Sequence, residues 1–171
     1  MIRQPKSIEK ALSDIASFCA TAERCRMEVE RKLRSWGLEP GDASRILERL
    51  EKEDFLNEQR YVSAFVHDKA AFDKWGPFKI RQALLQKNLP LPLVESAIQS
   101  LEEENGFHEA EEALGRYLCK RALELLKKDQ DPYRQSQSLI SSGLQRGFSP
   151  ETVLRIIRSL DLPGEFSDSA D

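Results

Sequence analysis

The chain has 171 residues and a formal net charge of −3, and 32% of its residues are charged. This length suits one compact domain or several short repeats, and the charged fraction favours repeats because an elongated chain has more surface to solvate. The composition argues against a polyelectrolyte partner for nucleic acid, a membrane span and a secretion signal, and the three cysteines form an odd set typical of a reducing compartment. We therefore expect a cytoplasmic protein.

The first two predicted helices run from about residue 5 to residue 22 and from Cys25 to Gly37. The first is amphipathic, with apolar side chains at helical spacing, namely Ile8, Leu12, Ile15, Ala16 and Phe18. Cys25 has capping-box spacing to Glu28, but a thiol accepts hydrogen bonds poorly and predicts a weaker helix start than serine would give. Asp42 is the expected N-cap of the third helix.

Asn57 is expected to cap a longer helix that completes a first three-helix repeat. Residues 1–75 would then hold an N-terminal helix and this repeat. Residues 76–130 form a second repeat, residues 131–162 a shortened third one, and residues 163–171 an acidic, disordered tail. No segment shows the alternation of a β-strand.

One sequence pattern, clearest as WGPFKIRQALLQKNL from Trp75 to Leu89, occurs in all three repeats. Gly37, Asn88 and Gly147 mark the same turn, at offsets of 51 residues (88 − 37) and 59 residues (147 − 88). Each of these residue types tolerates a positive φ angle. The sequence thus predicts an elongated, all-α fold of tandem three-helix units, three in number, the first with an extra N-terminal helix.

No catalytic constellation is recognisable in the sequence. His67 and His108 lie far apart, without a cysteine or second histidine at ligand spacing, and there is no phosphate-binding glycine loop and no nucleophile elbow. We therefore expect neither enzymatic activity nor a cofactor or metal.

The best candidates for binding are two basic clusters. The first interleaves cations with Phe72, Trp75 and Phe78 and consists of Lys69, Lys74, Lys79, Arg81 and Lys87. The second is Arg31, Lys32 and Arg34. Such a segregated charge pattern steers a partner even when the net charge is near zero. The alternative is a solvated face beside ordinary core aromatics, and composition alone does not separate the two.

The run from Leu56 to Leu89 resembles the central signature of the RecX family, bacterial regulators of the RecA recombinase. The matching motifs are Leu56, Asn57-Glu58, Tyr61, Phe65-Val66, Gly76-Pro77, Lys79-Ile80-Arg81 and Lys87-Asn88-Leu89. The run CRMEVERKL, from Cys25 to Leu33, is similar to an earlier helix start of that family.

Several positions depart from the family pattern. Asn57 replaces an aspartate, Cys25 a serine, Lys69 an arginine and Asn88 a glycine, and these keep a similar shape or role. Ala83 stands where the family often has glutamate, which we expect to leave Arg81 freer to contact a ligand.

The resemblance implies a curved helical protein that lies in the groove of the RecA–DNA filament, where it would slow strand exchange and ATP hydrolysis. We expect a monomer that binds neighbouring protomers through the two basic clusters, with weak contact to DNA phosphates and no membrane contact. Two alternatives remain open: a direct DNA-binding helical module, which the pI of about 5.6 disfavours, and a general protein–protein scaffold.

Overall fold

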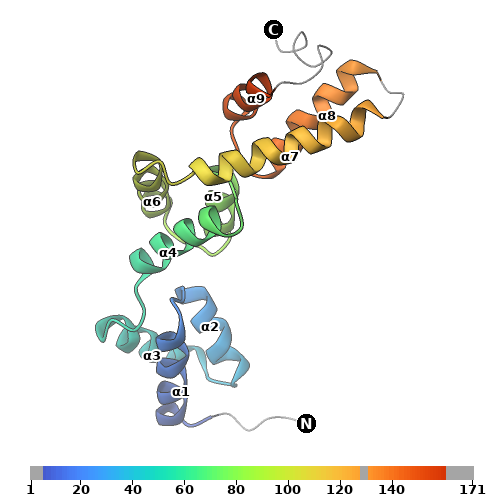
Figure 1. Ribbon diagram of the computed structural model, residues 1–171. Helices are drawn as coiled ribbons and strands as arrows, with labels where there is room; N and C mark the ends of the chain where they lie inside the picture. The colour runs from blue at the N-terminus through green and yellow to red at the C-terminus, as the bar shows by residue number, and fades with distance from the viewer. Residues whose placement is uncertain (1–5, 128–130, 161–171) are drawn as a thin grey trace.

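A computed structural model describes residues 6–127 and 131–160, and within these ranges the chain forms nine α-helices and no β-strand (Figure 1). The helices are α1 (Ile8–Thr21), α2 (Arg26–Ser35), α3 (Pro40–Lys52), α4 (Glu58–Ala71), α5 (Pro77–Leu85), α6 (Leu91–Glu103), α7 (His108–Leu126), α8 (Pro132–Gln145) and α9 (Pro150–Ser159). The all-α prediction is confirmed. The predicted tail at 163–171 lies outside the described residues.

The helix starts follow local chemistry, with one correction. The Ser7 side chain accepts a hydrogen bond from the Lys10 N–H at the start of α1, and Asn57 accepts one from the Arg60 N–H at the start of α4. Cys25 is the N-cap of α2 and makes no side-chain cap hydrogen bond, which agrees with the poor acceptor strength of a thiol. The prediction that Asp42 caps α3 is wrong, because α3 already begins at Pro40, whose fixed φ suits the first helical position.

The three equivalent turns have the backbone conformation that the sequence pattern predicts. The φ angles of Gly37, Asn88 and Gly147 are +78°, +60° and +88°. Each residue follows a helix and turns the chain towards the next one, at α2, α5 and α8 respectively. The shared turn chemistry therefore reflects a repeated structure.

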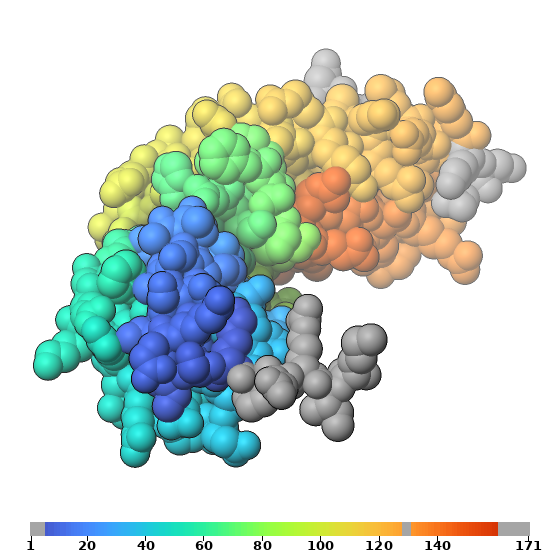
Figure 2. Space-filling view, turned by 90° about the horizontal axis from the view of Figure 1, so that it is seen from below, coloured from blue at the N-terminus to red at the C-terminus, as the bar shows by residue number. Residues whose placement is uncertain are grey.

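The helices pack as three successive units, α1–α3, α4–α6 and α7–α9. Each unit has its own apolar core. Ile15, Leu33 and Leu50 are buried in the first unit, Val62, Ile80 and Leu84 in the second, and Leu114, Leu118 and Leu139 in the third. Figure 1 shows the units following one another from the N-terminal to the C-terminal end of the molecule, and Figure 2 shows that the row bends. The fold is therefore an elongated, curved helical repeat.

These packing units differ by one helix from the ranges predicted for the repeats. The prediction places α4 with α2 and α3, whereas α4 packs against α5 and α6. A constant offset along the sequence shows that the helices recur. It does not show which helix is the first of each unit, because the offset is the same whichever helix is taken as the first. The division into domains at residues 75 and 130 stays a prediction, since contacts alone do not show which segments fold independently.

The two joints between units are built differently. At the joint of the second and third units, α4 packs against α7, and the Gly76 and Phe78 N–H groups donate to the carbonyls of Arg146 (2.8 Å) and Gly147 (2.9 Å). Helix packing of that extent is not found between α1–α3 and α4–α6 in the described part of the chain.

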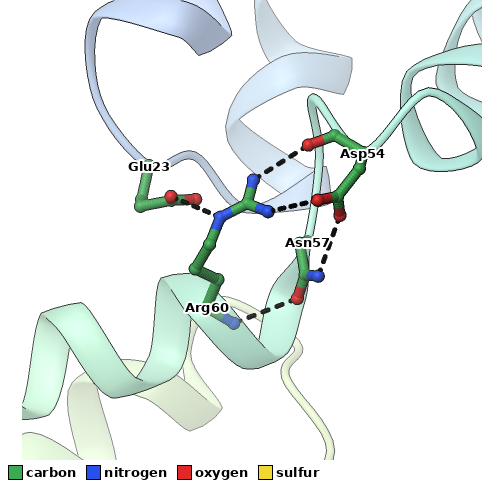
Figure 3. Close-up of polar contacts among 4 residues, drawn as sticks. All are labelled: Glu23, Asp54, Asn57 and Arg60. Atoms are coloured by element: carbon green, nitrogen blue, oxygen red, sulfur yellow. Dashed lines mark hydrogen bonds and ion pairs between the residues drawn. The ribbon is translucent and has the colours of Figure 1, made fainter.

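Side-chain polar contacts cross the joint between the first and second units instead. In Figure 3, the Arg60 guanidinium on α4 donates to the carboxylate of Glu23, which lies between α1 and α2, and to Asp54, which follows α3. Asn57 completes the network by donating to the Asp54 carboxylate at 3.0 Å. Exposed ion pairs of this kind are weak and sensitive to salt, so this network should depend more on ionic strength than the main-chain hydrogen bonds at the other joint.

Candidate partner-binding surface

The structure does not present the first basic cluster as one free face. Lys69 lies on α4, Lys74 on the loop after it, Lys79 and Arg81 on α5, and Lys87 just beyond α5. Their side chains point to different neighbours, and four of the five form ion pairs within the chain. The cluster in the sequence therefore separates into cations with different roles.

Trp75 is the platform for two of these cations. The Nζ atoms of Lys69 and Lys79 lie 5.0 and 4.3 Å from the centre of its ring, which places both in cation–π contact. Lys69 also binds the Asp73 carboxylate at 2.7 Å, and Lys74 binds Glu109 at 2.7 Å. Among the five cations, Lys79 is the one without a carboxylate partner in the described residues.

Arg81 is held by a carboxylate that the sequence analysis did not consider. Its guanidinium makes a two-pronged contact with Glu95 on α6, with the second bond 2.8 Å long, and it lies 4.9 Å from the Phe78 ring centre. The hydrogen bond from Arg81 lowers the pKa of the Glu95 carboxyl. The expectation that Arg81 is freer is therefore wrong: Glu95, fourteen residues away, provides the charge partner that Ala83 does not.

Lys87 has a structural role at the joint of the first two units. Its Nζ lies 2.6 Å from Oε1 of Glu28 on α2, and the Tyr61 hydroxyl donates to the same oxygen at 3.2 Å. Burial would raise the pKa of Glu28, but the bonds and charge of Lys87 outweigh it and lower that pKa. This pair binds two units of the chain to each other.

The second cluster is exposed on α2, as a binding surface requires. Arg31, Lys32 and Arg34 have no carboxylate partner in the described residues, and Lys32 Nζ lies 5.5 Å from the Phe18 ring centre and 5.8 Å from that of Trp36. A pocket of about 290 Å³ opens beside Phe18 and is lined in part by Arg31 and Lys32. The three cations are thus exposed on one helix, and their role in partner binding stays a prediction.

One basic residue of interest was not predicted. The Arg146 guanidinium lies 3.4 Å from the ring centre of Tyr117 and lines a pocket of about 500 Å³ with Lys74 and Lys79. The repeat itself contained the signal, because Arg146 is the equivalent of Lys87 (87 + 59 = 146). A search for basic residues at equivalent turn positions would have found it.

Neither a metal centre nor a membrane-spanning segment is found among the described residues. These residues contain no group of three or more His, Cys, Asp or Glu side chains placed to hold a metal ion. None of the described helices is both long and apolar enough to cross a bilayer. The features that remain are charged and aromatic surfaces.

Fold and surface together define a class: all-α proteins of tandem three-helix units that carry basic, aromatic-lined surfaces. The family model for the second three-helix domain of RecX matches residues 57–98, which cover α4, α5 and most of α6. The regulatory protein RecX of Leptothrix cholodnii is 32% identical over 145 residues, which cover 84% of this chain and 85% of the relative. The chain belongs to the RecX family.

Other relatives and solved structures agree with this assignment. The regulatory protein RecX of Prosthecochloris aestuarii is 26% identical over 88% of this chain and 93% of its own length. That of Listeria welshimeri is 22% identical over 96% of this chain, which spans only 60% of that longer relative. The crystal structure of RecX from Lactobacillus salivarius is similar in fold, with a TM-score of 0.73, 25% identity and coverage of 90% of this chain and 96% of that one.

Proposed function

We propose that this protein binds the RecA–DNA filament and inhibits the recombinase, slowing strand exchange and ATP hydrolysis. The observation that carries the proposal is the match to a regulatory protein RecX over 84% of the chain. The elongated, curved row of three units supports it, because such a body contacts several protomers of a polymer at once. Preferential binding to one filament state is sufficient to shift filament assembly.

In this proposal the protein acts as a cytoplasmic monomer and uses first the cations that have no carboxylate partner among the described residues. These are Lys79, Arg31, Lys32 and Arg34. The other candidates, Lys69, Lys74, Arg81 and Lys87, would have to exchange a carboxylate of this chain for one of the partner. That exchange gains little, so we expect them to contribute less than those first four cations.

Co-sedimentation with RecA–DNA filaments, together with the rate of RecA ATP hydrolysis, tests the proposal. The parent protein should sediment with filaments and reduce the rate of hydrolysis. The variant Arg31→Gln/Lys32→Gln/Arg34→Gln should bind about tenfold more weakly. A matched control, Lys52→Gln/Lys120→Gln/Arg134→Gln, removes three exposed charges elsewhere and should bind like the parent. A parent protein that neither sediments nor inhibits would show the proposal to be wrong.

The exposed row of Arg31, Lys32 and Arg34 on α2 also favours a second candidate function, direct binding to DNA. Affinity for DNA should then be measured without RecA at several salt concentrations. Tight binding with a steep salt dependence, lost in the triple glutamine variant, would favour this candidate. Weak binding that does not change in the variant would favour the filament.

A further inference from the structure

Lys79 and Arg146 come from different units, 67 residues apart in sequence (146 − 79), yet they line one pocket of about 500 Å³. We propose that this pocket, which we call the joint pocket, binds a carboxylate side chain from an acidic segment of the protein partner. The inference rests on the proposed function and adds to it the chemistry of the surface that is recognised. Trp75 and Tyr117 form walls of the same pocket.

The backbone fixes the two cations relative to each other. The Gly76 N–H donates to the Arg146 carbonyl at 2.8 Å, and the next bond joins the Phe78 N–H to the Gly147 carbonyl at 2.9 Å. The two backbone segments approach so closely that a Cβ atom on Gly147 would lie 2.3 Å from the Cβ of Lys79. The spacing of the two positions is therefore set by main-chain contact and not by flexible side chains.

Each cation is also held in place before any ligand arrives. Lys79 Nζ lies 4.3 Å from the ring centre of Trp75, and the Arg146 guanidinium lies 3.4 Å from that of Tyr117. Both cations are half-buried. Such contacts restrict the rotamers of long side chains, so less conformational entropy remains to be lost on binding.

The positive charge of the pocket is not neutralised within the described part of the chain. Neither Lys79 nor Arg146 has a carboxylate partner there, and the acidic lining residue Asp73 is bound by Lys69 at 2.7 Å. The third lining cation, Lys74, is bound by Glu109. Two fixed and uncompensated charges in a half-buried site are the arrangement that an anion completes.

The observations favour a carboxylate over a nucleic acid. Base stacking needs an open ring face, but Trp75 has two cations over its ring, Tyr117 has one, and both rings are half-buried. A polynucleotide also needs a continuous basic track, whereas the pocket offers a pair of cations on a chain with a net charge of −3. An aspartate or glutamate side chain matches that pair.

Filament binding of full-length variants tests the inference. Arg146→Gln and Lys79→Gln should each weaken co-sedimentation with RecA–DNA filaments by about tenfold. The control Lys120→Gln removes an exposed charge from α7 outside the pocket and should bind like the parent. Unchanged circular dichroism melting curves of the pocket variants would show that folding is intact. Carbodiimide treatment of the parent complex should join Lys79 to an aspartate or glutamate of RecA.

The outcomes separate this inference from the proposal on which it rests. If the parent does not bind filaments, the proposed function is wrong, and the inference is then wrong as well. If the parent binds but both pocket variants bind equally well, the inference alone is wrong. It is also wrong if the pocket variants lose affinity for naked DNA to the same extent, because the recognised anion would then be a phosphate.

Discussion

Lys87 Nζ lies 2.6 Å from Glu28 Oε1 and joins the turn after α5 to α2 across the joint of the first two units. Both side chains are largely buried, with 22% and 23% of their surfaces exposed. Because helix packing across this joint is sparse, this pair and the Arg60 network in Figure 3 are the main polar contacts that hold the first unit to the second.

Replacement of Lys87 by methionine should lower the free energy of unfolding by about 1–2 kcal/mol. The methionine keeps the apolar stem but leaves the Glu28 charge without its partner in a largely buried site. Loss of one member of a fully buried pair costs about 3–5 kcal/mol, and the remaining exposure of both groups reduces that cost. Urea denaturation measures the effect. Arg49→Met, which breaks an exposed pair with Glu53, is the control and should cost about 0.5 kcal/mol or less.

Acid should remove the contribution of the same pair. The pKa of Glu28 in the folded protein lies below its ordinary value of 4.5, so its contribution to stability is present above that pH. As the pH falls through the lower, folded-state pKa, the carboxylate is protonated and the contribution is lost. The stability difference between the parent and Lys87→Met should therefore shrink between pH 6 and pH 3. A difference that stays constant over this range would contradict the assignment of the interaction to Glu28.

Loss of the Arg60 network should make the first joint open more often. In Arg60→Ala, Glu23 loses its bond to α4 and Asp54 keeps only its bond from Asn57, whose side chain can still cap the helix. Cys25 reports on opening, because it is fully buried among residues of the second unit and burial raises the pKa of its thiol. The rate at which Cys25 reacts with a thiol reagent should rise in the variant.

Two comparisons make this labelling experiment specific. Cys19 is buried in the core of the first unit, away from the joint, and its labelling rate should not change. Arg45→Ala removes an exposed arginine of α3 and should leave both rates as in the parent. Equal acceleration at Cys19 and Cys25 would indicate general unfolding of the first unit, which contradicts opening at the joint.

The sequence predicted most of the local structure, although α3 begins at Pro40 and is not capped by Asp42. Apolar spacing located the helices, and the recurring turn at Gly37, Asn88 and Gly147 identified the repeat, because both depend on residues close together in the chain. The positive φ at all three turns confirms that interpretation.

Such patterns did not predict contacts between residues that lie far apart in the sequence. Arg81 pairs with a glutamate on the next helix, Lys87 with one 59 residues away, and Arg146 shares a pocket with Lys79 of another unit. Contacts of this kind depend on how helices pack within and between units, and the repeat offset is the same for every grouping of the helices. The sequence therefore predicted which residues are basic neighbours, but not which of them have a partner.

The turn at Gly147 connects backbone geometry to the joint pocket, because Gly147 packs directly against Lys79. Gly147→Ala should destabilise the protein by about 2–4 kcal/mol in urea denaturation. A positive φ of +88° costs alanine about 1 kcal/mol, and the new Cβ would overlap the Cβ of Lys79, which adds about 1–3 kcal/mol.

Gly41→Ala is the matched control, because a Cβ there meets no atom within 4 Å and the residue lies in the first turn of α3. It should leave stability unchanged or raise it by about 0.5–1 kcal/mol. At a temperature where Gly147→Ala is still folded, its filament affinity should nevertheless fall, because relief of the overlap moves Lys79 away from Arg146. Parent-like affinity in a folded Gly147→Ala protein would mean that the spacing of these two cations does not matter for binding.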